Sequence, residues 1–188
     1  MDRREVVSRV LSERGESLVV TGLGSPSYDV HAAGDHDANY YLWGAMGGAA
    51  LVGLGLALAQ PERRVIVITG DGEQLMAYGS LATIAVAKPR NLDIFVLDNE
   101  HYGETGMQIS HTGRGLDLAA VAAASGFVEA ATVRTIDAVA SLSAASNEDG
   151  PRLFVLKIRA EDTPRSLPSR DAVFIKNRFR AHLDLAPN

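Results

Sequence analysis

The feature that most constrains the fold is a series of short apolar runs that end in turn-forming residues. The clearest run is residues 65–69 (VIVIT), which is followed directly by residues 70–73 (GDGE). Four further runs have the same character: residues 18–21, 40–43, 92–97 and 153–158. Because the runs are continuously apolar and do not alternate with polar residues, we expect strands that are covered on both faces of a parallel sheet.

Segments with apolar residues at helical spacing separate these runs. We expect helices at residues 6–11, 74–87, 116–124 and 136–145. A short helix should also follow the turn at residues 22–26, and another should run from the turn at residues 44–48 to about residue 59. Residues 31–38 are expected to form a loop. Strands that alternate with helices predict a single α/β domain over residues 1–188, a three-layer fold with helices on both faces of a parallel sheet. Residues 161–188 are expected to form a C-terminal tail that lies over the domain or over a partner.

Glycine clusters follow several of the expected strands. They lie at residues 22–24, 44–48, 70–72 and 103–106. The carboxyl ends of parallel strands meet at one edge of a sheet, where ligands bind in folds of this class. We therefore expect the clusters to converge on one ligand site.

The segment from Gly70 to Glu73 predicts a phosphate site that includes a cation. Its glycines let the backbone approach a phosphate, and the helix that follows offers free N–H groups. The Asp71 carboxylate would repel a phosphate unless a hard cation such as Mg²⁺ lay between them. Asn99, just past the next strand, would add an amide oxygen. A GDG turn alone is also common as a simple tight turn, but its combination with Asp98-Asn99 is far more specific.

Composition excludes several classes of site. The 188 residues contain no cysteine, which excludes disulfides, thiolate metal sites and iron–sulfur clusters. The net charge is −5 and no basic stripe is present, so nucleic acid is not expected as a partner. Residues 45–59 are apolar but short and rich in glycine, which indicates a buried helix and no membrane partner. With no signal-peptide pattern at the N-terminus, we expect a cytoplasmic protein.

These motifs resemble those of enzymes that depend on thiamine diphosphate (thiamine pyrophosphate), in which Gly-Asp-Gly is followed one strand later by Asn. Residues 43–48 (WGAMGG) resemble the turn that cradles the aminopyrimidine ring in pyruvate-decarboxylase-like members. Residues 21–25 (TGLGS) resemble the segment that touches the diphosphate. The resemblance covers nearly the whole chain, and is closest to the sulfopyruvate decarboxylase β subunit and the corresponding part of phosphonopyruvate decarboxylase.

The resemblance implies a role for each matching residue. Asp71 and Asn99 would give side-chain oxygens to Mg²⁺, and His101 its backbone carbonyl. The Gly44 carbonyl would accept a hydrogen bond from the 4′-amino group, and Met46 would hold the cofactor in a bent conformation. Five residues are expected to lie along the diphosphate: Gly22, Ser25, Gly70, Gly72 and Glu73. Of these, Gly72 and Glu73 would donate backbone N–H groups to it.

Three residues beyond the metal segment are candidates to face the substrate: Tyr102, Glu104 and His111. Glu104 could act as a general acid. The alternative for Glu104 is a surface carboxylate on a loop. Glu104 also departs from the small residue expected in the sulfopyruvate subunit, and a carboxylate fits poorly beside a sulfonate or phosphonate.

The resemblance implies a non-oxidative 2-oxo acid decarboxylase that uses thiamine diphosphate and Mg²⁺ and acts on a 3-substituted pyruvate such as sulfopyruvate or phosphonopyruvate. In this family the glutamate that contacts N1′ lies in a separate pyrimidine-binding domain, and no glutamate here suits that role. We therefore expect a hetero-oligomer with an α subunit that carries it, and a homodimer when the chain is isolated.

Three alternatives use the same cofactor. A split acetolactate-synthase-like or transketolase-like carboligase has the same cofactor site. A non-catalytic thiamine diphosphate-binding protein is disfavoured because Asp71 and Asn99 are both intact. A 2-oxo acid:ferredoxin oxidoreductase β subunit is disfavoured by the absence of cysteine.

Overall fold

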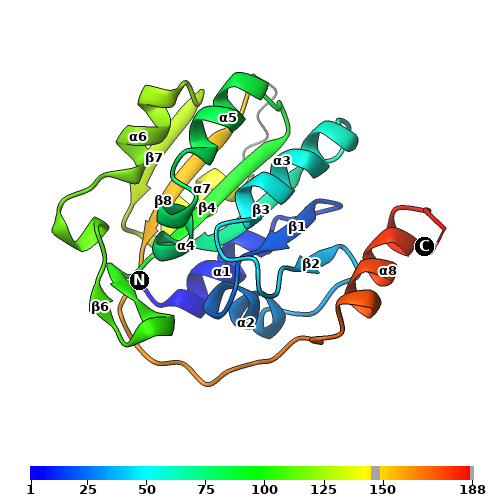
Figure 1. The fold of residues 1–188 in the computed structure, drawn as a ribbon, viewed down its shortest axis with the longest axis horizontal. Helices are drawn as coiled ribbons and strands as arrows, with labels where there is room; N and C mark the ends of the chain where they lie inside the picture. The colour runs from blue at the N-terminus through cyan, green and yellow to red at the C-terminus, as the bar shows by residue number, and fades with distance from the viewer. Residues whose placement is uncertain (145–148, 187–188) are drawn as a thin grey trace.

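The computed structural model describes residues 1–144 and 149–186, and a six-stranded parallel sheet forms its centre (Figure 1). The strand order is β2-β1-β3-β4-β8-β7. The strands are β1 (Leu18–Thr21), β2 (Asn39–Tyr41), β3 (Val65–Gly70), β4 (Leu92–Asp98), β7 (Glu129–Val133) and β8 (Arg152–Lys157). Every neighbouring pair is parallel, which confirms the predicted sheet.

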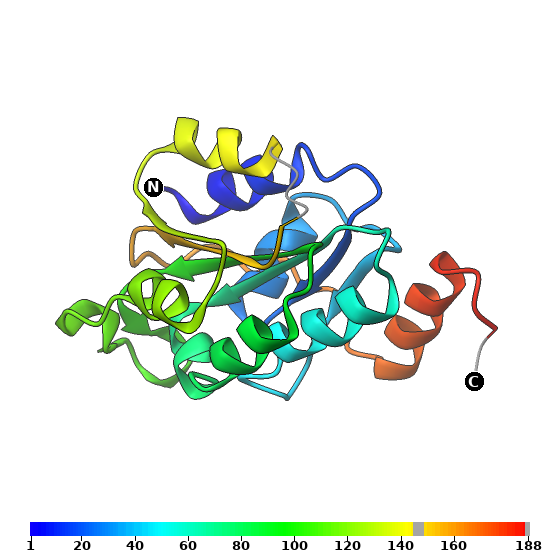
Figure 2. The same ribbon diagram turned by 90° about the horizontal axis from the view of Figure 1, so that it is seen from above.

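Helices cover both faces of the sheet, as the three-layer prediction requires (Figure 2). One face carries α1 (Arg3–Leu11), α2 (Ser25–Ala32) and α7 (Ile136–Ala144). The other carries α3 (Ala49–Ala59), α5 (Ser80–Ala87) and α6 (Leu118–Ser125). The short helix α4 (Asp71–Met76) begins where β3 ends.

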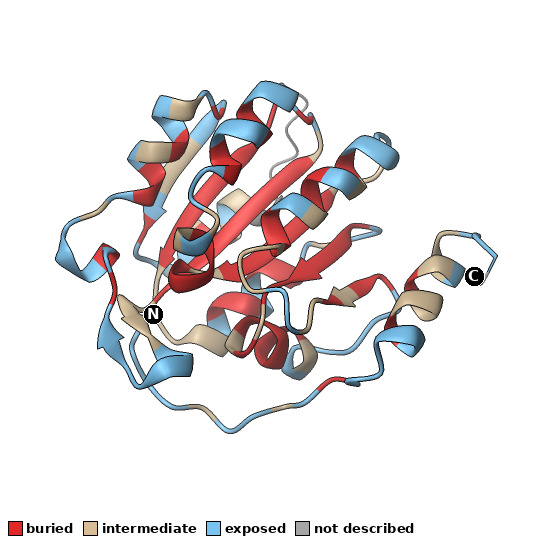
Figure 3. Ribbon diagram, in the orientation of Figure 1, coloured by how far each residue is buried: buried red, intermediate tan, exposed pale blue. Residues whose placement is uncertain are grey.

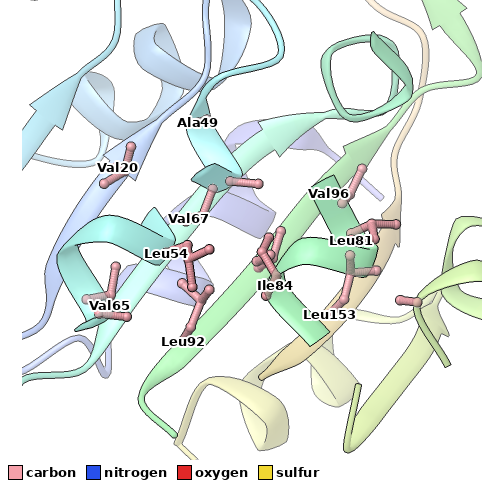
Figure 4. Packing of buried hydrophobic residues seen from close by; sticks show 14 of the residues in the cluster. Val20, Ala49, Leu54, Val65, Val67, Leu81, Ile84, Leu92, Val96 and Leu153 are labelled. Atoms are coloured by element: carbon pink, nitrogen blue, oxygen red, sulfur yellow. The ribbon is translucent and has the colours of Figure 1, made fainter. Parts of the chain in front are cut away.

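The continuous apolar runs supply both layers of core at once. Along β3, Val65 and Val67 belong to the cluster under α3 and α5, whereas Ile66 and Ile68 belong to the cluster under α1 and α7. All four side chains are fully buried, and strands β1, β4 and β8 are buried in the same way, whereas the edge strand β7 is mostly exposed or half-buried (Figure 3). Figure 4 shows Leu54 and Ile84 lying over the sheet in the first of these clusters.

Helix α3 packs against strand β3 at a residue that has no side chain. A Cβ atom on Gly53 would be 2.3 Å from Cγ2 of Val67. The apolar run 45–59 forms a helix, as predicted, and it begins at Ala49, but only the face toward the sheet is buried, since Leu51 and Leu58 are 43% and 57% exposed. None of the helices in residues 1–144 and 149–186 is long and apolar enough to cross a membrane.

The prediction of one helix over residues 74–87 is wrong. The structure has two helices there, α4 and α5, with a turn at residues 77–79 between them. The interruption between the two helices coincides with a change in burial. Leu81 and Ile84 of α5 are fully buried against the sheet, whereas Met76 and Tyr78, before α5, are exposed. A single straight helix would not bring both segments into these positions.

Smaller differences concern element ends. Strand β2 stops at Tyr41, two residues before the predicted end, and α2 extends to Ala32, into the predicted loop. The predicted helix at 136–145 is present as far as Ala144, and residue 145 lies outside the described residues.

Strand β7 and helix α8 (Ala172–His182) were not predicted. Strand β7 is an edge strand of small and polar residues, and α8 lies within the segment expected to be a tail. The Asp171 carboxylate caps α8 by accepting from the amides of Val173 and Phe174. Phe179 packs against the ring of Tyr40, so α8 lies beside the β2 edge, and residues 161–171 cross the domain to reach it (Figure 1). Residues 187–188 lie outside the described part.

Beyond β4 the chain forms a small antiparallel hairpin of β5 (His101–Tyr102) and β6 (Gln108–Ile109), with short 3₁₀ turns η1 (Gly103–Thr105) and η2 (Thr112–Arg114). This hairpin stands at the carboxyl end of the sheet. The adjacent strands β1 and β3 are followed by helices on opposite faces, α2 and α4–α5. Such a switch in direction opens a crevice at the carboxyl ends of the two strands.

Candidate functional site

A pocket at this crevice collects most of the predicted site residues. Its lining includes Ser25, Met46, Gly70, Asp71, Gly72, Glu73, Asn99, His101, Tyr102 and Glu104. The predicted residues that do not line it are Gly22, Gly44 and His111. The glycine clusters at 22–24, 44–48, 70–72 and 103–106 each contribute a lining residue or directly flank one, so the predicted convergence is present.

Asp71 is buried at the start of α4 and belongs to a network of hydroxyl groups. Its Oδ2 atom accepts a hydrogen bond from Ser110 Oγ at 2.6 Å, and Thr112 Oγ1 lies 3.1 Å away. Thr112 Oγ1 also lies 2.8 Å from Oδ1 of Asp98. Burial and the nearby charge of Asp98 raise the pKa of Asp71, although the hydroxyl groups act against this. Lys157, 2.7 Å from Asp98 Oδ2, is the cation of this network.

The turn after β4 places Asn99 and His101 beside Asp71 in the pocket. Oδ1 of Asn99 accepts from the His101 amide at 2.9 Å, and the His101 ring Nδ1 lies 2.8 Å from the Asn99 carbonyl oxygen. Glu100 between them has a φ of 64°, in the left-handed region that is unfavourable for a residue with a side chain. Hydrogen bonds from its amide to Asp98 and from Lys157 to its carboxylate hold this conformation.

The donor set of these residues fits a hard cation. Carboxylate, amide and backbone carbonyl oxygens are the protein ligands that Mg²⁺ takes, with phosphate and water oxygens as the rest. This ligand set contains only one carboxylate. In the part of the chain that the structure describes, no cluster of three or more His, Cys, Asp or Glu side chains could hold a metal ion by itself.

Glu73 differs from its predicted role because its side chain, and not only its backbone, is engaged. The carboxylate is buried and accepts from the amides of Leu23 and Gly47, both at 3.2 Å. It also accepts from Thr69 Oγ1 at 3.0 Å. Burial raises the pKa of Glu73, and these hydrogen bonds act against the rise. Nothing in the local sequence indicates this role, because the partners come from other segments.

Gly22 lies against this carboxylate and not in the pocket lining. A Cβ atom at residue 22 would be 1.7 Å from Oε2 of Glu73. Gly44 also lies outside the lining, in a turn where Gly44 and Gly47 have φ values of 74° and 92°. These left-handed conformations suit glycine, and they place Met46 between them in the pocket wall.

The candidate substrate-facing residues lie at the rim. The Tyr102 hydroxyl is 2.5 Å from Nδ1 of His111, which joins the hairpin to the segment after it. Glu104 lines the pocket and packs over Gly24, where a Cβ atom would be 2.1 Å from its Oε1. Ser110, Thr112 and Lys157 were not predicted as site residues, because their carboxylate partners are distant in the chain.

Residues 26–156 match the family model described as "Thiamine pyrophosphate enzyme, C-terminal TPP binding domain". The chain is 34% identical over 178 residues to sulfopyruvate decarboxylase subunit beta of Methanocaldococcus jannaschii, which covers 94% of each chain. It is 38% identical over 192 residues to phosphonopyruvate decarboxylase of Streptomyces viridochromogenes, which covers 98% of this chain and 47% of that one.

Solved structures share the fold at low sequence identity. Benzoylformate decarboxylase of Polynucleobacter necessarius superposes with a TM-score of 0.72 at 23% identity, over 87% of this chain and 34% of that one. The 2-oxoglutarate:ferredoxin oxidoreductase of Magnetococcus marinus gives 0.69 at 18% identity, over 92% of this chain and 65% of that one. At these identities the likeness concerns the fold alone.

Proposed function

Because the chain belongs to the thiamine pyrophosphate enzymes and carries their C-terminal cofactor-binding domain, we propose that it is the cofactor-binding subunit of a non-oxidative 2-oxo acid decarboxylase. The relatives that support this are named sulfopyruvate and phosphonopyruvate decarboxylases. The observation that carries it in the structure is the meeting of Asp71, Asn99 and His101 in one pocket beside the 70–72 turn.

In this proposal the chain binds the cofactor through a cation. Asp71 and Asn99 would hold Mg²⁺ with side-chain oxygens, and His101 with its carbonyl. Gly70, Gly72, the backbone of Glu73 and residues 22–25 would bind the diphosphate. Met46 would support the ring system from the 44–48 turn, and the Gly44 carbonyl would accept a hydrogen bond from its amino group.

When bound, thiamine pyrophosphate supplies the electron sink that lets a 2-oxo acid lose CO₂. The protein positions the substrate and moves protons around that step. Tyr102, which lines the pocket, is hydrogen-bonded through its hydroxyl to Nδ1 of His111, so His111 can orient this hydroxyl toward the substrate. Glu104, which lines the pocket, can deliver a proton as a general acid.

The proposed substrate is a pyruvate with an anionic group on C3, such as sulfopyruvate or phosphonopyruvate. The names of the two relatives support this class. A hollow next to the pocket adds no support of its own: Arg3 and Arg165 line it, but so do three carboxylates, and Arg3 is ion-paired with Asp29. The three carboxylates are Glu104, Glu161 and Asp162.

The proposed enzyme needs a second chain that carries the pyrimidine-binding domain and its glutamate. The likeness to a subunit beta over 94% of both chains supports this arrangement. Met76 supports it as well: it lines the pocket and is 65% exposed, and Tyr78 beside it is 43% exposed. Apolar side chains gathered at the rim of a binding site are typical of a surface that a partner covers.

A carboligase is the weaker candidate. The E. coli acetolactate synthase isozyme 1 large subunit is 29% identical over 129 residues, which is 63% of this chain and 23% of that subunit. The decarboxylases match at higher identity and over more of the chain.

The metal site tests the proposed function. Asp71→Ala should abolish the Mg²⁺-dependent binding of thiamine pyrophosphate, because it removes the charged oxygen ligand. Isothermal titration calorimetry with and without Mg²⁺ measures this, and Glu62→Ala, an exposed carboxylate beyond α3, is the matched control. Unchanged cofactor affinity in Asp71→Ala would overturn the assignment.

A further inference from the structure

Helix α3 begins without a cap of its own. Its N-cap residue is Gly48, which has no side chain to cap the helix, and the first turn of the helix contains no acidic residue. Free N–H groups at a buried helix start need an acceptor, and the positive end of the helix favours an anion. The carboxylate of Glu73, on α4, fills this position by accepting from the amides of Gly47 and Ala49 on either side of the cap.

The same carboxylate reaches across the crevice to a third segment. Its Oε2 atom accepts from the amide of Leu23, in the turn between β1 and α2, and from Thr69 at the end of β3. One buried group therefore joins the three segments that form the cofactor pocket: residues 22–25, 44–48 and 70–73.

The chain leaves room for this contact at Gly22. A methyl group there would be 1.7 Å from Oε2 of Glu73 and 3.1 Å from Oγ1 of Thr69. The φ of Gly22 lies outside the left-handed region that excludes side chains. The backbone would therefore accept alanine, and the main obstacle to it is the Glu73 side chain.

We propose that the Glu73 carboxylate is a positioning group that fixes the β1–α2 turn and the 44–48 turn relative to the Asp71 metal site, so that the pocket is formed before thiamine pyrophosphate binds. The role of Glu73 in cofactor binding rests on the proposed function, whereas its contact with the two turns does not. Pre-organisation of this kind lowers the cost of ordering the pocket when the ligand binds.

The contact can be tested on the full chain without cofactor. Gly22→Ala should lower the midpoint of thermal unfolding by about 5 °C or more, since the methyl group displaces the carboxylate. In a Glu73→Ala background the same change should cost less than about 2 °C. Gly55→Ala, on the exposed side of α3 with nothing within 4 Å of the added carbon, is the control. Equal effects of Gly22→Ala in both backgrounds overturn the proposed contact.

Trp43 gives a signal that is specific for the positioning role. It is the only tryptophan and directly precedes the 44–48 turn. Glu73→Ala should shift its emission in the folded protein, because the turn loses its anchor, whereas Gly55→Ala should not. An unchanged spectrum in folded Glu73→Ala contradicts a role in holding this turn.

Cofactor binding completes the test in the complex with the partner chain. Glu73→Ala should raise the KM for thiamine pyrophosphate by about 10- to 100-fold, the usual effect of removing a group that orients ligating residues, with a smaller change in kcat. If the wild-type complex binds the cofactor and Glu73→Ala binds it equally well, the positioning role is wrong. If the wild-type complex binds no thiamine pyrophosphate, the proposed function fails. The Glu73 contact is then judged by the other two experiments alone: the coupling between Gly22→Ala and Glu73→Ala, and the emission of Trp43.

Discussion

At the scale of single residues, the Thr112 hydroxyl lies between two buried carboxylates. Its hydroxyl oxygen is 2.8 Å from Asp98 and 3.1 Å from Asp71, and Ser110 adds a second hydroxyl at 2.8 Å from it. Thr112 has one hydroxyl hydrogen, so it donates to one carboxylate at a time, while Ser110 donates to Asp71. These hydrogen bonds partly offset the cost of two like charges close together in the interior.

Thr112→Val keeps the shape of the side chain and removes the hydroxyl. We expect a loss of about 1–3 kcal/mol in the free energy of unfolding, because buried acceptors lose a donor. Urea unfolding of the full chain measures it. Thr132→Val, at an exposed position of β7, should change stability by no more than about 0.5 kcal/mol. Equal effects at both positions would show that the hydroxyl does not bridge the carboxylates.

The sequence analysis identified Asp71, Asn99 and Met46 as site candidates because their motifs follow strand ends, and strand ends of a parallel sheet meet. It could not find the roles of the Glu73 side chain or of Thr112. The role of Glu73 depends on which residues face each other across β1 and β3, and that of Thr112 on how the hairpin lies against β4. The spacing of residues along the sequence does not define either arrangement.

At the scale of elements, α3 depends on one glycine for its distance from the sheet. Gly53→Ala should destabilise the protein by about 1–3 kcal/mol, because the added methyl group meets the buried Val67, whose branched side chain has few alternative rotamers. Gly55→Ala on the same helix should instead stabilise it by up to about 1 kcal/mol. Thermal unfolding compares the two. A stabilising Gly53→Ala would mean that α3 does not press on β3.

Helix α8 is held to the β2 edge partly by charge. Arg178 lies 2.6 Å from Oδ2 of Asp35, and the Tyr41 hydroxyl donates to Oδ1 at 2.7 Å. Burial pushes the pKa of Asp35 up, but these hydrogen bonds more than offset it and leave the pKa below its usual value. A lowered pKa means that the folded state favours the ionised carboxylate, so this stabilisation is present near neutral pH and is lost as the pH falls through the lowered pKa.

Asp35→Asn should therefore cost up to about 1 kcal/mol at pH 7, the upper limit for an exposed ion pair. The difference from the wild type should shrink as the pH falls below the ordinary pKa of an aspartate, about 3.9, and should vanish once the pH lies below the lowered pKa of Asp35. Unfolding curves at several pH values, with Glu62→Gln as control, measure it. A difference that stays constant down to pH 3 would show that the charge of Asp35 is not involved.

The elements that were predicted are those with a strong pattern. The runs at 65–69 and 92–97 are continuously apolar, and both are central strands. Strand β7 was missed because residues 129–133 are small or polar and lie at an edge, where little burial is required. The break at residues 77–79 was missed because apolar spacing continues across it, and only the packing of α5 on the sheet determines it.

At the scale of the whole molecule, the proposed function makes the pocket a half-site. In that proposal the described residues would supply the metal ligands, the glycine turns and the support for the cofactor ring, at the open carboxyl edge of the sheet. The proposed second chain would close this edge and place its glutamate against the ring. A buried contact of this kind is usually large and apolar, which fits the exposed Met76 and Tyr78 at the rim.

The most direct test of this account is CO₂ release measured for the purified chain, with and without the candidate α subunit, in excess thiamine pyrophosphate and Mg²⁺. A panel of 2-oxo acids should include sulfopyruvate, phosphonopyruvate, pyruvate and a branched 2-oxo acid. The account predicts turnover only for the two chains together, with a 3-substituted pyruvate preferred over pyruvate. Robust turnover by the isolated chain would contradict the two-chain account. A clear preference for pyruvate or the branched acid would contradict the substrate class but not the cofactor site.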